Sequence, residues 1–92
     1  MKTKVDETHY SKSAKKYIQS RTKKEKERLK NIIEENLETL PPKGDIKPLV
    51  GFSDERKRLR IGSVRIIFRY DEEGNLLILS ILDIGNRGDI YK

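Results

Sequence analysis

Four arginines lie close together in one stretch of the chain, and their spacing suggests a site for phosphate groups. They are Arg58, Arg60, Arg65 and Arg69. In extended backbone, side chains two positions apart point to the same face, so we expect these four to gather on one face of a hairpin. A guanidinium group donates paired hydrogen bonds to phosphate oxygens and keeps its positive charge in proteins. The pattern therefore favours binding of a polyanion, most simply consecutive phosphates.

The turn of this hairpin determines which arginines lie opposite each other. If Gly62-Ser63 is a two-residue turn, Arg60 lies directly opposite Arg65. Like charges directly opposite on a sheet are destabilising, on the order of the 0.2–1 kcal/mol that favourable pairs contribute. A solvated face is the alternative, because an exposed two-stranded face is often basic and arginine covers apolar neighbours with its stem. Spacing alone leaves both interpretations open.

Other candidate residues carry weaker signals. A second basic zone follows two predicted helices and comprises Lys12, Lys15, Lys16, Lys23, Lys24, Lys26, Arg28 and Lys30. Such a run is typical of the solvated face of an amphipathic helix. His9, the single histidine, has no acid or second ligand nearby in the predicted layout, which favours a structural or surface role. Tyr91 belongs to no apolar stripe.

The arginines need strands to hold them, and the second half of the chain predicts three. Lys57–Ile61, Val64–Tyr70 and Asn75–Ile84 alternate or run continuously apolar and are rich in branched residues. They are joined by the turn at residues 62–63 and by a second turn at 71–75. Apolar side chains on the face opposite the arginines are Leu59, Ile61, Val64, Ile66 and Phe68. The third strand is apolar at both alternating positions, which predicts a central strand covered on two faces.

The first half of the chain has a helical period. A short strand over Thr3–His9 precedes a helix that begins at Ser11 or Ser13 and ends near residues 20–21. A second helix begins at Thr22 with a capping-box pattern and ends at Pro41-Pro42. Its apolar stripe is formed by Leu29, Ile32, Ile33, Leu37 and Leu40.

Residues 41–55 are predicted to be a loop, with Leu49, Val50 and Phe52 as anchors to the core. The resulting fold class is α+β with the order β-α-α-β-β-β. A helical hairpin packs on a twisted antiparallel sheet, and residues 1–92 form a single domain.

Composition excludes several classes of protein. The 92 residues are 34% hydrophobic and 39% charged, and no apolar run approaches the roughly 20 residues of a membrane span. The chain has no cysteine and one histidine, which excludes disulfide frameworks and thiolate or multi-histidine metal sites. With 21 basic and 15 acidic residues, the net charge of +6 favours an anionic partner. We expect a cytoplasmic protein without a metal or other cofactor.

Two segments of the chain carry a resemblance to a known family. The stretch Lys57–Tyr70, with the sequence KRLRIGSVRIIFRY, and the closing stretch Ile84–Tyr91, with the sequence IGNRGDIY, resemble the RelE/ParE superfamily of bacterial and archaeal toxins. Residues 10–16 resemble the strand-to-helix entry of that superfamily, and residues 47–51 resemble its loop before the second strand. The resemblance covers nearly the whole chain in the expected order, and it implies two helices on a twisted antiparallel sheet.

The RelE branch implies a specific reaction. Its members cleave messenger RNA in the ribosomal A site without a metal, by attack of the substrate's own 2′-hydroxyl on the adjacent phosphate. Such chemistry needs a group to take the proton, cations for the developing phosphorane charge and an acid for the leaving oxygen. The partners that this implies are the ribosome, the message and a cognate protein antitoxin, with no membrane involved.

The resemblance also implies roles for individual residues. Arg60 and Arg65 would stabilise the phosphate charge, Arg87 would polarise the leaving oxygen or hold the scissile phosphate, and Tyr91 would stack on a base or accept the proton. The supporting phosphate contacts would come from Arg58, Arg69, Lys57 and Lys47. RelE-like toxins often carry lysines on the second strand, whereas the arginines here cannot exchange a proton. Acid–base work would then fall on Tyr91 or on ribosomal RNA.

Two other functions compete with this hypothesis. A ParE-like poison of DNA gyrase would use the same scaffold without cleaving RNA. A plain nucleic-acid-binding module would explain the basic surface without any reaction, and each removed cation would then lower affinity and salt dependence uniformly.

Overall fold

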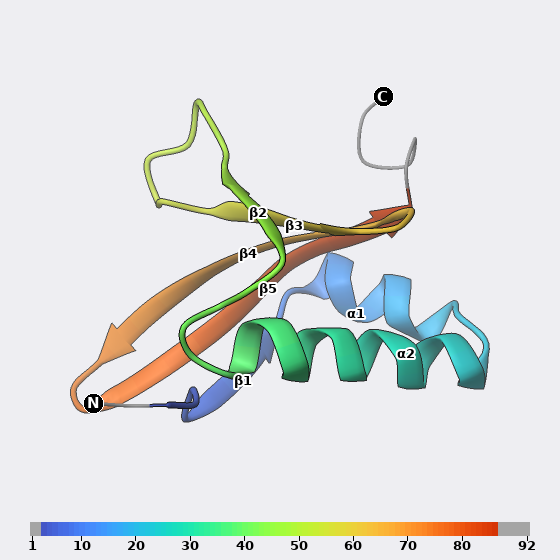
Figure 1. Cartoon of the computed structure of the whole chain (residues 1–92), viewed down its shortest axis with the longest axis horizontal. Helices are drawn as coiled ribbons and strands as arrows, with labels where there is room; N and C mark the ends of the chain where they lie inside the picture. Colours follow the sequence, from blue (N-terminus) through green and yellow to red (C-terminus); the bar gives the residue numbers. More distant parts are fainter. Residues whose placement is uncertain (1–2, 87–92) are drawn as a thin grey trace.

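The structure, a computed structural model, describes residues 3–86 of the chain and has two layers (Figure 1). Its elements are β1 (Glu7–Tyr10), α1 (Lys12–Gln19), α2 (Lys23–Ile33), the π-helical turn η1 (Glu34–Glu38), β2 (Asp45–Pro48), β3 (Lys57–Ile61), β4 (Val64–Glu73) and β5 (Leu76–Asn86). The five strands form one sheet in the order β1-β5-β4-β3-β2, and the two helices pack on one of its faces. The predicted α+β class, with two helices on a sheet, is confirmed.

Two details of the sheet differ from the prediction. β2 lies inside the segment predicted to be a loop and pairs antiparallel with β3, while β1 pairs in parallel with β5 and makes the sheet mixed. Both strands have four residues and lie at the sheet edges, and β2 ends in Pro48, a residue confined to edges because it cannot donate to the ladder. Strands this short depend on tertiary pairing, so their local pattern is weak.

Side-chain caps set the beginnings of both helices. The hydroxyl of Ser11 accepts a hydrogen bond from the Ala14 amide at 3.0 Å, and the hydroxyl of Thr22 accepts one from the Glu25 amide at 3.2 Å. The Thr22 hydroxyl in turn donates to the Glu25 carboxylate at 3.1 Å, so half of the predicted capping box forms. Where the sequence predicts that the second helix continues, the structure has the π-helical turn η1. The backbone is extended at Thr39, directly after it.

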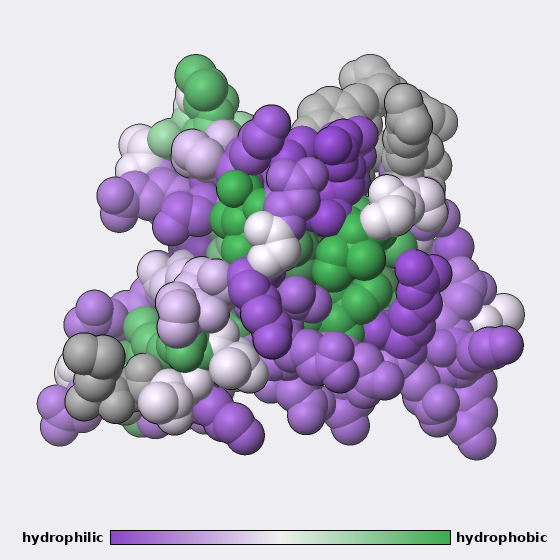
Figure 2. Space-filling view, viewed as in Figure 1, coloured by the Kyte–Doolittle hydropathy of each residue, from purple (hydrophilic) through white to green (hydrophobic). Residues whose placement is uncertain are grey.

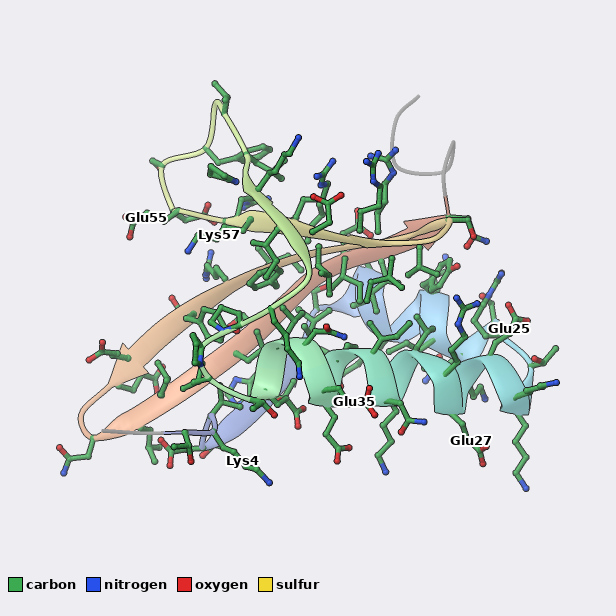
Figure 3. All side chains as sticks on the ribbon, viewed as in Figure 1. Lys4, Glu25, Glu27, Glu35, Glu55 and Lys57 are labelled. Atoms are coloured by element: carbon green, nitrogen blue, oxygen red, sulfur yellow. The ribbon has the colours of Figure 1, made fainter. Side chains whose placement is uncertain are left out.

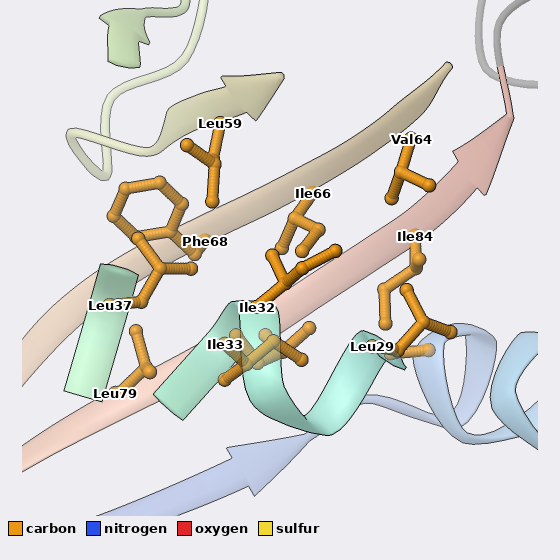
Figure 4. Packing of buried hydrophobic residues seen from close by; sticks show 12 residues of the cluster. Leu29, Ile32, Ile33, Leu37, Leu59, Val64, Ile66, Phe68, Leu79 and Ile84 are labelled. Atoms are coloured by element: carbon orange, nitrogen blue, oxygen red, sulfur yellow. The ribbon is translucent and has the colours of Figure 1, made fainter. Parts of the chain in front are cut away.

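The core lies between the two layers (Figure 4). The helical side contributes Ala14, Leu29, Ile32, Ile33 and Leu37, and the sheet contributes Leu59, Val64, Ile66, Phe68, Leu79, Ile81 and Ile84. Burying one such aliphatic or aromatic side chain contributes about 1.5–3 kcal/mol, so this interface fixes the helical hairpin on the sheet. Because the helices occupy this face, the alternate residues of β3 and β4 point to the opposite face.

The register of the central hairpin matches the prediction. Ile61 pairs with Val64 and Arg60 with Arg65, on either side of a turn in which Gly62 has a φ of 58°. That positive φ is open to glycine and strained for most other residues. Between β4 and β5 the register shifts by one residue, and Leu82 is left without a partner on β4. β5 lies inside the sheet, as predicted, between β1 and β4.

The loop between β2 and β3 differs most from its prediction. It rises from the sheet on the side away from the helices (Figure 1). The side chains of Val50 and Phe52 are 96% and 50% exposed, so they are not anchors to the core as predicted. Gly51, with a φ of 93°, forms the turn between them. Figure 2 shows the resulting apolar tip at the end of the loop.

No helix in the described part of the chain combines the length and the apolar character that crossing a membrane requires.

Candidate nucleic-acid interface

The sheet face opposite the helices carries cations in two neighbouring rows. One row runs Lys47, Arg58, Ile67 and Asp83, and the next runs Asp45, Arg60, Arg65 and Gly85, each across β2, β3, β4 and β5. Adjacent residues in such a row have Cβ atoms about 4.5–5.5 Å apart. Arg58, Arg60 and Arg65, here called the arginine cluster, are therefore near neighbours on one surface, as the sequence predicts.

Burial distinguishes the members of the arginine cluster. Arg58 and Arg65 are each 9% exposed, whereas the Arg60 side chain is 46% exposed. A buried cation needs an opposite charge and hydrogen bonds to offset its lost hydration. Asp45 supplies charge to two members: its carboxylate oxygens lie 3.6 Å from Arg58 Nη2 and 3.3 Å from Arg60 Nε. A single carboxylate thus lies between two guanidinium groups.

Arg58 retains unused hydrogen-bonding capacity. Its Nε and Nη2 are buried and make no hydrogen bond within residues 3–86. Guanidinium nitrogens that are held in place and lack hydrogen-bond acceptors can bind the paired oxygens of a phosphate. Lys47, the exposed neighbour of Arg58 on β2, adds a positive charge at the rim.

Arg69 lies on the same face in a different environment. Arg69 Nη1 is 2.6 Å from Asp54 Oδ2, and Arg69 Nε is 3.1 Å from Asp71 Oδ2. Arg56 Nη2 also binds Asp54 Oδ2, at 2.7 Å. The hydrogen bond from Arg56 holds the pKa of Asp54 well below its usual range, and the bond to Asp71 raises the pKa of Arg69. Asp54, Arg56, Arg69 and Asp71, here called the paired cluster, balance their charges internally.

The remaining predicted residues fall in three places. Lys57 pairs with the core residue Phe68, so strand alternation directs it to the helix side and away from Arg58; Figure 3 shows it at the start of β3. Arg87 and Tyr91 lie outside the described residues.

His9 does have an acid nearby, contrary to expectation: its Nε2 is 2.7 Å from Glu7 Oε1. Residues 7 and 9 alternate onto one face of β1, and this brings the carboxylate beside the ring.

Two tyrosines that pack against the core are poor proton acceptors. Burial raises the pKa of Tyr70 to about 12, and its hydroxyl donates to the Leu37 carbonyl at 2.6 Å. Burial and the Glu38 carboxylate raise the pKa of Tyr10. Both side chains pack against the core on the helix side. The arginine cluster therefore offers charge stabilisation and binding, and neither of these tyrosines adds acid–base chemistry to it.

The basic zone of the helices is a solvated surface. All eight of its lysine and arginine side chains are exposed. Figure 3 shows Glu25, Glu27 and Glu35 on the same helical layer. Mixed charge on an exposed helix face is the ordinary way to keep it soluble, in agreement with the interpretation from sequence.

Sequence reasoning misses the carboxylates that separate the two clusters. The sequence pattern places Asp45 in a loop, and it gives no reason to pair Asp54 with an arginine two strands away. The sequence contains one usable signal, which is spacing. Asp45 and Lys47 are two residues apart, as are Arg58 and Arg60. Once β2 is known to pair with β3, both residues must share the arginine face. Within residues 3–86, no group of three histidine, cysteine or acidic side chains could hold a metal ion.

Comparison with known proteins identifies the class that this fold and face define. The family model of the ParE toxin of the type II toxin–antitoxin system parDE matches residues 9–91. The chain therefore belongs to this family of toxins, within the RelE/ParE superfamily that its motifs resemble. No curated protein matches it.

Two solved toxin complexes are similar to the chain. The RelB–RelE antitoxin–toxin complex from Methanococcus jannaschii contains a chain with 27% identity and a TM-score of 0.61. The match covers 90% of this chain and 94% of that one. The archaeal RelE–RelB complex from Pyrococcus horikoshii OT3 gives 28% identity and a TM-score of 0.58, over 96% of this chain and 99% of that one.

Proposed function

We propose that this toxin of a type II toxin–antitoxin system is an endoribonuclease that cleaves messenger RNA in the ribosomal A site and so stops translation. The reaction is attack of the RNA's own 2′-hydroxyl on the adjacent phosphate, without a metal. It leaves a 2′,3′-cyclic phosphate on one fragment and a 5′-hydroxyl on the other. This activity belongs in the cytoplasm, where the ribosomes are.

The observation that carries the proposal is the arginine cluster. Arg58 and Arg65 are almost fully buried beside Arg60, and one carboxylate, Asp45, forms ion pairs with both Arg58 and Arg60. A structural sheet face gains nothing from like charges placed directly opposite each other. A phosphorane-like transition state, by contrast, gains from fixed cations that are already in position when its charge develops.

The proposal assigns complementary tasks to the residues. Arg60 and Arg65 stabilise the phosphate charge, Arg58 and Lys47 hold the flanking backbone, and Arg87 and Tyr91 serve the leaving oxygen and the proton transfer. Arginine stays protonated, so the proton acceptor must be a different group, and Tyr91 or ribosomal RNA fills this role. Arg69 and Lys57 contribute less, because Arg69 is balanced by carboxylates and Lys57 is directed to the other face.

The partner in the resting state is a cognate antitoxin. The two similar solved structures are both complexes of a RelE toxin with a RelB antitoxin. By analogy, an acidic segment of the antitoxin would lie over the arginine cluster and mask it until the toxin is released.

A second function is favoured by a different observation. The family model that matches residues 9–91 is that of ParE, whose branch includes poisons of DNA gyrase. A gyrase poison needs a binding surface and no phosphate chemistry. The arginine cluster would then contact protein or DNA, and substitutions in it would reduce affinity without removing a chemical step.

One experiment separates the two functions. Purified protein is added to a reconstituted translation reaction on a defined message, and new 5′ ends are mapped by primer extension, with a ribosome-free control. We expect new ends inside A-site codons only when ribosomes are present, and none with Arg65→Gln. Lys30→Gln, which removes one exposed charge from the helix layer, should cleave like the wild type.

An intact message would overturn the ribonuclease proposal. The same protein would then be tested for inhibition of gyrase supercoiling. Inhibition that is lost with Arg65→Gln would assign the arginine cluster to gyrase binding.

A further inference from the structure

A cavity of about 420 Å³ lies beside the arginine cluster, on the same face of the sheet. Its wall is the β2–β3 loop, through Leu49, Val50 and Phe52, and its floor is formed by Ile67 and Leu82. The register shift between β4 and β5 places both Leu82 and Asp83 in the lining of this cavity. The residues that line the cavity come from the loop, from β4 and from β5 at the register shift, and none of these lining residues belongs to a helix.

Two side chains of the apolar wall are exposed. Val50 is 96% exposed and Phe52 is 50% exposed, although the loop that carries them is anchored. The loop is held by the bond from the Leu49 amide to the Arg56 carbonyl at 3.1 Å and by the ion pairs of Asp54 with Arg56 and Arg69. A loop that is fixed in place while it presents apolar side chains to solvent indicates a preformed binding wall.

The chemistry of the wall suits a flat, aromatic ligand. The Arg56 guanidinium lies over the Phe52 ring, with Arg56 Cζ 4.1 Å from the ring centroid. Bases of single-stranded RNA stack on phenylalanine rings and on guanidinium planes in this way. The polar group at the floor is Asp83, whose Oδ1 accepts hydrogen bonds from Ser13 and from the Ile84 amide.

The cavity is also within reach of the phosphate site. Arg58 on β3 pairs directly with Ile67 on β4, and Ile67 pairs with Asp83 on β5. One cross-strand step of about 5 Å therefore separates the stem of Arg58 from the cavity floor. A nucleotide whose phosphate lies on Arg58 can place its base against the loop.

We propose that this cavity binds one unstacked nucleobase of single-stranded RNA, between the Phe52–Arg56 stack and the Ile67–Leu82 floor, while Arg58 binds that nucleotide's phosphate. The inference rests on the proposed ribonuclease function and adds a base-recognition subsite to it. The Asp83 carboxylate accepts a hydrogen bond from an exocyclic amino group. Adenine, cytosine and guanine carry such a group and uracil does not, so uridine is the weakest ligand.

The direct test is a methyl NMR titration of the purified full chain with the four nucleoside 5′-monophosphates and with ribose 5-phosphate. We expect the nucleotides to shift the methyl signals of Val50, Leu82 and Ile67, with UMP the weakest. Ribose 5-phosphate should leave the Val50 and Leu82 signals in place. Equal shifts with nucleotides and ribose 5-phosphate, or none at these methyl groups, would overturn the proposal.

A variant separates stacking from phosphate binding. Phe52→Ala should weaken nucleotide binding about 10-fold and leave ribose 5-phosphate binding unchanged, because only the base loses its platform. Leu76→Ala removes a comparable exposed apolar side chain at the far end of the β4–β5 hairpin and should change neither. Unchanged nucleotide affinity in Phe52→Ala would contradict the assignment. The apolar wall would then serve a protein partner such as the antitoxin.

The failures of the two proposals are distinguishable. Cleavage on the ribosome without base-dependent shifts would leave the ribonuclease function standing and remove the base subsite. Base-dependent shifts without cleavage would remove the ribonuclease function and leave the base subsite standing. This face would then be a nucleic-acid-binding surface alone.

Discussion

Two groups of arginines share one face of the sheet and have opposite electrostatic situations. In the paired cluster, Arg56 and Arg69 meet Asp54 and Asp71 at 2.6–3.1 Å, and cations and anions match in number. In the arginine cluster, Arg58 and Arg60 share Asp45 at 3.3–3.6 Å, and Arg65 lies directly opposite Arg60. The carboxylates of the first group neutralise its arginines, and we propose that the second group binds an anion from outside.

The difference in charge balance between the two clusters does not come from the strand positions of the arginines. Arg65 and Arg69 lie on the same strand and the same face, four residues apart. What separates them is the neighbouring backbone: the β2–β3 loop brings Asp54 to Arg69, and β2 brings Asp45 to the arginine cluster. Function in a basic sheet face therefore depends on where the rest of the fold supplies matching carboxylates.

The largest expected effect comes from substituting one arginine of each cluster by glutamine. Arg65→Gln should lower cleavage about 100-fold or more, because a preorganised charge at the transition state is lost. Arg69→Gln should keep cleavage within a few-fold of wild type and lower the stability, because Asp54 and Asp71 lose their partner. Single-turnover cleavage and urea unfolding of both variants measure the two effects.

Comparable loss of cleavage in both variants, at equal folded fraction, would contradict the division into two clusters. Far-UV circular dichroism of Arg65→Gln provides the control that the variant is folded.

Asp45→Asn should sharpen the contrast by removing the carboxylate shared by Arg58 and Arg60. We expect the affinity for single-stranded RNA to rise about threefold to fivefold, because partly exposed ion pairs of about 0.2–1 kcal/mol no longer compete with phosphate. The free energy of unfolding should fall, since the arginines then repel without this counter-ion. Fluorescence anisotropy at fixed salt measures the affinity. Glu72→Gln, far along β4, is the matched control, and an equal rise there would mean a nonspecific effect of net charge.

Tyr70→Phe tests a polar contact on the helix side, away from both clusters. Its hydroxyl donates to the Leu37 carbonyl at 2.6 Å in a half-buried setting. Removing this bond should lower the free energy of unfolding by about 1 kcal/mol. Cleavage and RNA affinity should stay at wild-type values, because the two faces are separated by the sheet. A loss of cleavage in the folded variant would show that the helix layer takes part in function.

The smallest effect is a pH dependence in the paired cluster. The pKa of Asp54 is held below its ordinary value of 3.8 by Arg56 and Arg69, so the unfolded chain binds the proton more readily than the folded one. The stabilisation is complete well above pH 3.8 and is lost as pH falls below that value. Urea midpoints of wild type and Asp54→Asn should converge between about pH 6 and about pH 2. Parallel midpoints over that window would exclude Asp54 as the titrating group.

Most of the fold follows from periodicity. Leu29, Ile32, Ile33 and Leu37 recur at helical spacing and are buried, and Leu59, Ile66 and Phe68 alternate and are buried as predicted. The two-residue turn at Gly62-Ser63 is sufficient to predict that Arg60 lies opposite Arg65, and the register confirms it. β1 and β2 were not predictable in detail, because four-residue edge strands take their identity and direction from distant partners.

The candidate site also has one part that the sequence predicts and another that only the fold sets. Local pattern places Arg58, Arg60, Arg65 and Arg69 on one face, because the side-chain period of a strand is a property of the backbone alone. Their compensation depends on Asp45 and on Asp54, the latter 15 residues away in the chain from its partner Arg69. The exposed positions of Val50 and Phe52 likewise depend on how the loop is anchored.

The sequence by itself determined the class of fold, the hairpin register, the basic face and the resemblance to toxins of the RelE/ParE superfamily. All of these depend on periodicity and on short motifs whose parts are close along the chain. The tertiary structure decided the separation into an arginine cluster and a paired cluster, and it built the apolar cavity beside them. Charge compensation and cavity formation depend on distances between segments far apart in sequence, and only packing sets those distances.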